Sequence, residues 1–168
     1  LQLDGQSVIS NAAVSENTAS AKGGGISVST AGGLQMNKGT VSENTAKSNG
    51  GGINADGTCK VNGSNLTGNQ SYGDGGAVYV GGGTFTTFQA NQAVTIEGNS
   101  AAKEGAGIYN KNVTVLNNNA HILINQCKNG SEHNVFHAGS QFLVEGNAEV
   151  KQEVYLTKDR FITASSKY

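Results

Sequence analysis

Short islands of alternating aliphatic and polar residues recur along this chain, and stretches rich in Gly, Asn and Ser separate them. Two consecutive sets of islands are 26–28, 34–36, 40–42 and 53–55, 59–61, 65–67. Alternation over so few residues is typical of short β-strands with one buried face. The Gly- and Asn-rich stretches between the islands leave no room for crossover helices, so the pattern predicts an all-β chain.

The islands belong to a repeat. A motif of one aliphatic residue, any two residues and Asn occurs at 14–17, 41–44, 66–69 and 96–99, with weaker copies at 122–125 and 144–147. Successive Asn residues are 27, 25, 30, 26 and 22 residues apart. A period of this length with short strands indicates one supersecondary unit stacked on copies of itself.

One arc of each period has a fixed length. Nine residues after each of the first four Asn stands an aliphatic residue that follows a glycine-rich triplet: Ile26, Ile53, Val78 and Ile108. The other arc varies, with 15, 13, 18 and 14 residues from that aliphatic to the next motif. Three short strands per period and no helix predict a single-stranded parallel β-helix of about six coils, right-handed by the usual crossover rule, spanning 1–168 as one domain.

The repeated residues have structural interpretations. Asn tolerates the left-handed backbone region, so we expect Asn17, Asn44, Asn69 and Asn99 at a corner, stacked as a hydrogen-bonded ladder. The glycines allow a positive φ and a close approach between coils. The aliphatic residues after the glycines form one predicted inward row, and those that open the Asn motifs (Val14, Val41, Leu66, Ile96) form a second.

The paired motifs resemble the repeats of chlamydial polymorphic outer membrane proteins, whose hallmarks are GGA(I/L/V) and FxxN. Gly75-Gly-Ala-Val78 fits the first, and Phe88-Gln-Ala-Asn91 fits the second outside the periodic register. The in-register copies have Val, Leu or Ile in place of Phe. The repeats also look like those of surface proteins of gut anaerobes. The resemblance implies a surface-exposed β-helix used for display or adhesion at the bacterial cell surface.

Composition narrows the choice of partners. Eleven basic residues, only one of them Arg, stand against twelve acidic ones, which argues against a nucleic-acid surface. No apolar run approaches the ~20 residues of a membrane span.

The two ends of the chain differ. Leu1 aligns with Ile53 in mid-coil, so we expect the first coil to pair with preceding chain of the parent protein. Residues 145–168 lose the glycine block and gain charge, as in a capping segment.

Enzymatic chemistry finds little support, although the alternative of a carbohydrate-active β-helix, a polysaccharide lyase or glycoside hydrolase fragment, stays open. Asp4-Gly5 and Asp56-Gly57 fall at the same point of coils one and three, near the carboxylate spacing of inverting hydrolases. Asp-Gly is also a common turn pair, which we favour.

No cofactor or metal site is predicted. His121, Cys127, His133 and His137 match no zinc motif and are interpreted as loop residues. Cys59 and Cys127, two coils apart, are expected to be free thiols.

One feature suggests binding. The residues after the in-register aliphatics point outward, and Tyr79 and Tyr109 would stack on neighbouring coils, either as a platform for a sugar or protein partner or as an ordinary cross-strand pair. The longest variable arc, 81–93, carries Phe85 and Phe88 and is expected to be a loop. We therefore predict a non-catalytic surface module that binds a host glycan or protein through this wall.

Overall fold

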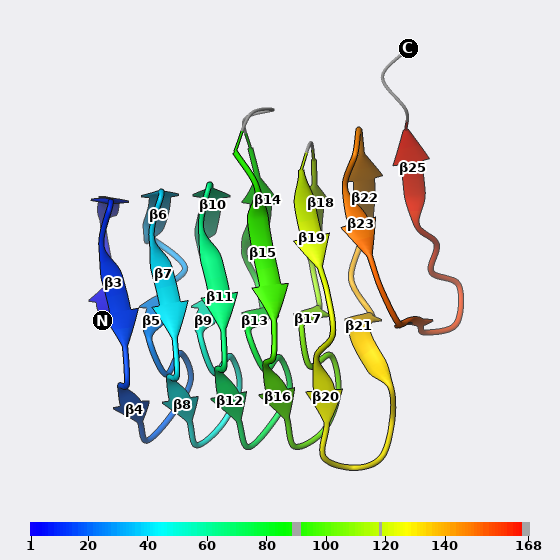
Figure 1. The fold of residues 1–168 in the computed structure, drawn as a ribbon, viewed down its shortest axis with the longest axis horizontal. Helices are drawn as coiled ribbons and strands as arrows, with labels where there is room; N and C mark the ends of the chain where they lie inside the picture. The colour runs from blue at the N-terminus through cyan, green and yellow to red at the C-terminus, as the bar shows by residue number, and fades with distance from the viewer. Residues whose placement is uncertain (89–91, 118, 166–168) are drawn as a thin grey trace.

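The computed structural model describes residues 1–88, 92–117 and 119–165, and Figure 1 shows them as a β-solenoid that runs from the N-terminus at one end to the C-terminus at the other. Every regular element in these ranges is a strand, and every pairing between strands is parallel. Within the same ranges the chain has no helix capable of crossing a membrane. The predicted parallel β-helix is thus confirmed.

Four sheets, here A to D, run along the solenoid. Sheet A comprises β1 (Gln2–Leu3), β5 (Ile26–Val28), β9 (Ile53–Ala55), β13 (Val78–Val80), β17 (Ile108–Asn110), β21 (His133–His137) and β24 (Glu153–Leu156). Sheet B comprises β2 (Gln6–Ser10), β6 (Gly33–Asn37), β10 (Thr58–Asn62), β14 (Thr84–Thr87), β18 (Val113–Leu116), β22 (Gln141–Glu145) and β25 (Thr163–Ser165). Sheet C comprises β3 (Ala13–Ser15), β7 (Thr40–Ser42), β11 (Asn65–Thr67), β15 (Val94–Glu97), β19 (Ala120–Ile122) and β23 (Glu149–Val150). Sheet D comprises β4 (Thr18–Ala19), β8 (Thr45–Ala46), β12 (Gln70–Ser71), β16 (Ser100–Ala101) and β20 (Gln126–Cys127).

Each full coil therefore has four strands, one more than the sequence predicts. The expected islands form sheets A, B and C, and the additional two-residue strands of sheet D follow each Asn of the repeat. Five coils are complete, and partial ones follow, so the expected total of about six is close. The two residues after each ladder Asn, such as Thr45 and Ala46, are thus extended strand. In the segment 145–168, the described residues add β23, β24 and β25 to sheets C, A and B.

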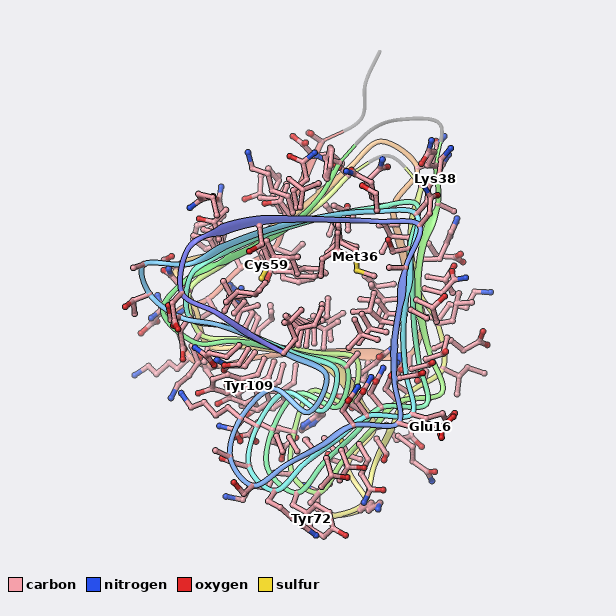
Figure 2. The ribbon with its side chains drawn as sticks, turned by 90° about the vertical axis from the view of Figure 1, so that its left-hand side faces the viewer. Glu16, Met36, Lys38, Cys59, Tyr72 and Tyr109 are labelled. Atoms are coloured by element: carbon pink, nitrogen blue, oxygen red, sulfur yellow. The ribbon has the colours of Figure 1, made fainter. Side chains whose placement is uncertain are left out.

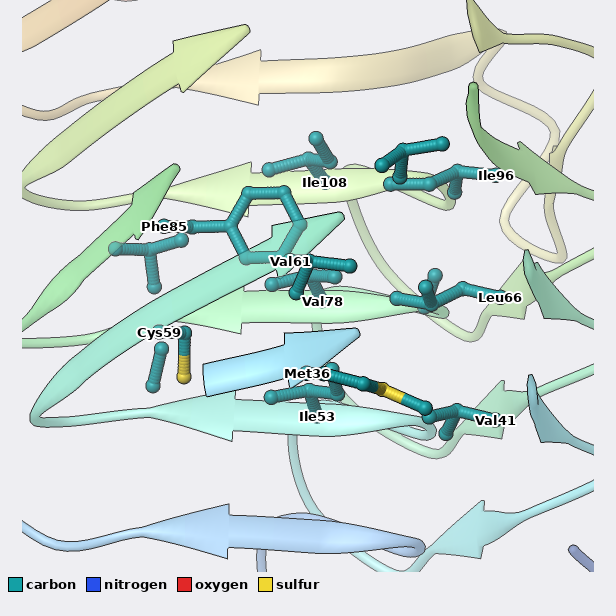
Figure 3. Close-up of a cluster of buried hydrophobic side chains, with 14 of the residues drawn as sticks. Met36, Val41, Ile53, Cys59, Val61, Leu66, Val78, Phe85, Ile96 and Ile108 are labelled. Carbon is teal, nitrogen blue, oxygen red and sulfur yellow. The ribbon is translucent and has the colours of Figure 1, made fainter. Parts of the chain in front are cut away.

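Sheets A, B and C enclose the main core (Figure 2). The two predicted inward rows are confirmed, because Ile26, Ile53, Val78 and Ile108 pair in register, as do Val14, Val41, Leu66 and Ile96. All eight are buried except the half-buried Val14 in the first coil. Figure 3 shows how the side chains of the two rows meet those of sheet B, including Met36, Cys59 and Phe85, inside the solenoid. Cys127 lies elsewhere, in a second small cluster with Ala101 and Ala106.

Sheet D and the glycine-rich turn form a smaller lobe beside the main core, with Tyr72 at its outer end (Figure 2). The turn passes directly over the next coil. A Cβ on Gly24 would lie 2.6 Å from the Thr45 carbonyl carbon, and one on Gly51 would lie 2.5 Å from that of Gln70. No side chain fits at that distance, which explains the middle glycine of each triplet. The equivalent residue of the next turn is Ala106, although β20 continues sheet D beyond β16 there, and nothing in the structure explains the exchange of Gly for Ala.

The repeated asparagines stack along the corner between sheets C and D. Asn44 illustrates the pattern: its backbone N–H and its Nδ2 both donate to Oδ1 of Asn69 (3.1 and 3.0 Å), and Nδ2 also donates to the Val14 carbonyl (2.8 Å). Asn17, Asn69 and Asn99 donate in the same way to the Asn of the following coil. The last rung is Asn125, whose N–H donates to Gln152 Oε1 at 3.0 Å.

The left-handed residue at this corner differs from the prediction. The residue before each Asn, and not the Asn itself, has the positive φ: Glu16, Glu43, Gly68 and Gly98, with φ between 54° and 67°. The Asn itself does not have a positive φ, and its amide bonds to the Asn of the following coil along the ladder.

Candidate functional site

Four aromatic side chains form a continuous stack on the outer side of sheet A, the side away from Met36 and Cys59 (Figure 2). Tyr79, Tyr109, Phe136 and Tyr155 occupy equivalent positions of β13, β17, β21 and β24. Their ring centroids are 5.4, 4.9 and 4.9 Å apart in that order, and no two neighbouring rings are tilted by more than 19°. We call this set the aromatic stack. It joins four consecutive coils by face-to-face contact, which stabilises the sheet.

Exposure increases along the stack towards the C-terminus. Tyr79 is 6% exposed, Tyr109 and Phe136 are half-buried, and Tyr155 is 39% exposed. At the closed end, the Lys22 Nζ lies 5.5 Å from the Tyr79 ring centroid and 3.3 Å from Asp56 Oδ2, so this side chain covers the ring. A partner would therefore reach the stack at Phe136 and Tyr155.

The Tyr109 hydroxyl lies in an acidic, partly buried environment. Burial raises its pKa to about 12, and the negative charges of Asp74 and Glu104 add to the effect. Burial also raises the pKa of Asp74 above its ordinary value. The phenol consequently stays protonated at all physiological pH values and can donate a hydrogen bond.

His133 packs beside the exposed end of the stack. Its Nδ1 pairs with Glu104 Oε2, and its Nε2 lies 3.8 Å from Glu153 Oε2. The imidazole centroid is 4.5 Å from that of Tyr155 and 5.9 Å from that of Phe136. The ring therefore links the fifth coil, through Glu104, to the last strand of sheet A.

The structure brings together only part of the predicted binding residues. Tyr79 and Tyr109 stack as expected, whereas the assignment of Phe85 to a binding loop is wrong: Phe85 lies in β14 and is fully buried in the core. Phe88 follows that strand and is half-buried, while its motif partner Asn91 lies outside the described residues. The arc 81–93 thus includes a strand of sheet B, because its alternating pattern continues the inward row of Cys59.

Sequence reasoning missed Phe136 and Tyr155. In the sixth coil, the in-register aliphatic is Val135, ten and not nine residues after Asn125, and the glycine triplet is lost. The signal was present nonetheless, because Phe136 follows Val135 and Tyr155 follows Val154, in the manner of Tyr79 after Val78.

The candidate catalytic carboxylates do not form an acid–base pair. Asp4 and Asp56 lie two coils apart at the same point of the coil, as predicted. A hydrogen bond from Gln2 lowers the pKa of Asp4. Burial alone would raise the pKa of Asp56, but the hydrogen bonds from Asn54 and Lys22 outweigh it, so the net shift of this pKa is downward. Both are ionised at neutral pH, so neither is held as the proton donor that a glycosidase needs.

The interpretation of the histidines as exposed loop residues is wrong. His121 lies in β19, and His133 and His137 lie in β21, with His137 only 1% exposed. Asn110 Nδ2 and the Gly139 N–H approach His137 Nδ1 at 3.0 and 3.3 Å. Burial lowers the pKa of His137, so it is a neutral core residue. No cluster of three His, Cys, Asp or Glu side chains able to hold a metal occurs in the described ranges.

Comparison with known families identifies one match. The model of the Chlamydia polymorphic membrane protein repeat matches residues 63–81 and 93–111. Each matched segment contains a ladder Asn, a sheet D strand, the glycine turn and a sheet A strand, which is the arc of constant length. No curated protein and no solved structure matches the chain. Residues 63–81 and 93–111 are therefore similar to the polymorphic membrane protein repeat, as the motifs suggest.

Proposed function

Taking these repeats as the premise, we propose that the chain is a non-catalytic module of a bacterial surface protein that serves adhesion or display. The matched repeat is that of a Chlamydia membrane protein family, which supports a surface module of an outer membrane protein in general. Adhesion is the more specific part of the proposal. A rigid solenoid with a chemically distinct side wall suits presentation of a binding surface away from the membrane.

The observation that supports binding is the exposed end of the aromatic stack. Tyr155 is 39% exposed and stacked on Phe136, so its ring is fixed in place before a partner arrives. Fixed, partly exposed aromatic rings are a favourable platform for a sugar ring or for an apolar group of a host surface protein. The carboxylates of Glu104 and Glu153 beside His133 can accept hydrogen bonds from such a partner.

The test compares binding of the parent and of Tyr155→Ala to cultured host cells and to a glycan array. Phe161→Ala is the matched control, because Phe161 is 71% exposed and outside the stack. We expect Tyr155→Ala to lose most of the binding and Phe161→Ala to keep it, with both melting near the parent temperature. Equal binding by folded Tyr155→Ala contradicts the role of the stack. Release of unsaturated or reducing sugar ends from polysaccharides by the parent contradicts the non-catalytic assignment.

We also propose that the first coil pairs with preceding chain in the full-length protein. The four strands of the first coil are edge strands, one in each sheet: β1, β2, β3 and β4. Leu1 is 56% exposed, Ile9 is only half-buried although it lies in the inward row of Met36, and Asn17 is the end rung of the ladder. An additional coil would cover these residues and donate to the Asn17 side chain. In a longer protein, Asn17→Ala should then cost as much stability as the same change in an internal rung.

A further inference from the structure

The outer face of sheet D combines polar side chains, two lysines and an exposed aromatic ring. Its strands present one row of hydroxyl and amide side chains, Thr18, Thr45, Gln70, Ser100 and Gln126. The residues that follow the strands present a second row in the same register, Ser20, Lys47, Tyr72, Ala102 and Lys128. These ten positions, the sheet D face, contain two Lys, one Tyr and no Asp or Glu, although the whole chain has a net charge of −1.

Tyr72 is the centre of this face. It is 51% exposed at the outer end of the smaller lobe (Figure 2). The Nζ of Lys47, from the preceding coil, lies 4.5 Å from its ring centroid, and the Nζ of Lys128 lies 6.0 Å away. Lys128 comes from two coils further on and reaches the ring across Ala102, whose methyl group leaves the path clear. Both cations are thus held over one exposed aromatic ring.

We propose that the sheet D face binds an anionic saccharide. Unlike Tyr79, Tyr72 keeps half of its surface exposed beside its lysines, so the remaining ring surface can contact a sugar ring, and the flanking ammonium groups can pair with a carboxylate or sulfate on that sugar. The backbones of Lys47 and Lys128 are three coils apart, which is ~14 Å at ~4.8 Å per coil. Their ammonium groups converge on the Tyr72 ring, at 4.5 and 6.0 Å from its centroid, so both can contact charged groups on one unit or on neighbouring units of a chain lying along the solenoid axis.

The neighbouring groups suit the same ligand. Gln70, Thr45 and Ser100 are half-buried donors and acceptors beside the tyrosine, within reach of sugar hydroxyl groups. A recess of about 180 Å³, lined in part by Ser100, Gln126 and the exposed Ile124, borders the face where sheet D ends. This site goes beyond the aromatic stack, which lies on the other side of the glycine turn, and each can fail without the other.

The experiment measures the affinity of the 168-residue protein for three saccharides of equal length. The probes are a heparin-derived hexasaccharide, hexagalacturonate and maltohexaose, each titrated at low and moderate salt. We expect binding of one or both anionic probes, weakened by salt, and none of the neutral one. The two anionic probes distinguish sulfate from carboxylate recognition.

Matched variants decide whether the face is responsible. Tyr72→Ala and the double variant Lys47→Gln, Lys128→Gln should each weaken binding by about tenfold or more, as expected for loss of a stacked ring or of two ion pairs. Lys60→Gln, an exposed lysine of sheet B, and Tyr155→Ala should leave the affinity unchanged, with all variants folded. Three results overturn the proposal: no binding of either anionic probe, full binding by Tyr72→Ala, or an equal loss with Lys60→Gln.

Discussion

An internal rung of the asparagine ladder should contribute far more stability than its size suggests. Asn69 is fully buried and its side chain takes part in four hydrogen bonds: Nδ2 donates to Val41 O and Asn99 Oδ1, and Oδ1 accepts from the N–H and Nδ2 of Asn44. At ~1 kcal/mol net for each bond, Asn69→Ala should lower the free energy of unfolding by about 4 kcal/mol. Part of this loss arises because the buried Asn44 N–H is left without an acceptor.

Asn17→Ala is the matched control, since the same residue type is exposed at the end of the ladder. It loses the two bonds that Asn17 Nδ2 donates, to Asn44 Oδ1 and Ser15 O, near solvent that can replace them. We expect a cost of ~1 kcal/mol or less. Asn69→Asp preserves the shape but replaces the donor with an acceptor that faces Asn99 Oδ1, so it should destabilise the protein strongly at pH 7.

The assay is equilibrium unfolding in urea, followed by the circular dichroism of the strands, with the slope checked for constancy before midpoints are converted to free energies. The slope matters because solenoids can unfold coil by coil. If Asn69→Ala costs no more than Asn17→Ala, or if Asn69→Asp is as stable as the parent, the ladder is a consequence of the fold and does not stabilise it.

Three further experiments test the glycine turn, the buried thiols and the buried histidine. Gly51→Ala should destabilise the protein by several kcal/mol because its Cβ would lie 2.5 Å from the Gln70 carbonyl, whereas Gly82→Ala, with only one contact at 3.7 Å, should be nearly neutral in the same urea titration. Burial raises the pKa of Cys59 to about 12 and also raises that of Cys127, so a thiol reagent at pH 8 should label neither in the folded protein and both after unfolding without reductant. Burial lowers the pKa of His137 below its ordinary value of 6.5, so the unfolded state binds the proton more readily. Stability should be complete above pH ~6.5 and fall as the pH drops towards the lowered pKa, and His137→Gln should show a smaller fall between pH 7.5 and 5 than the parent.

The type of fold and its register follow from the sequence. The aliphatic rows of Ile53 and Leu66 alternate with polar residues, and burial of one strand face leaves a single register in which each coil pairs with the next. The fixed nine residues from Asn69 to Val78 contain the whole smaller lobe, and the glycine triplet marks where backbones touch. Regular, local signals such as these need no knowledge of distant contacts.

Details that depend on contacts between neighbouring coils appear only once the chain is folded. The two-residue strands of sheet D are too short to have a hydrophobic period, so they are visible only when five of them pair side by side. The assignment of Phe85 failed because a strand and a loop of similar length and composition differ mainly in what covers them. The positive φ likewise falls on Glu43 and not on Asn44, which the sequence does not reveal.

In the candidate sites, too, some positions follow from the repeat and others depend on contacts between coils. The outward positions of Tyr79 and Tyr109 follow from the repeat, but the closure of one end by Lys22 and the opening at Tyr155 depend on side chains from other coils. Tyr72, Lys47 and Lys128 stand 25 and 56 residues apart in sequence, and nothing local connects them. They meet because a solenoid places every residue beside its counterparts one coil before and after, so that side chains distant along the chain become neighbours along the axis.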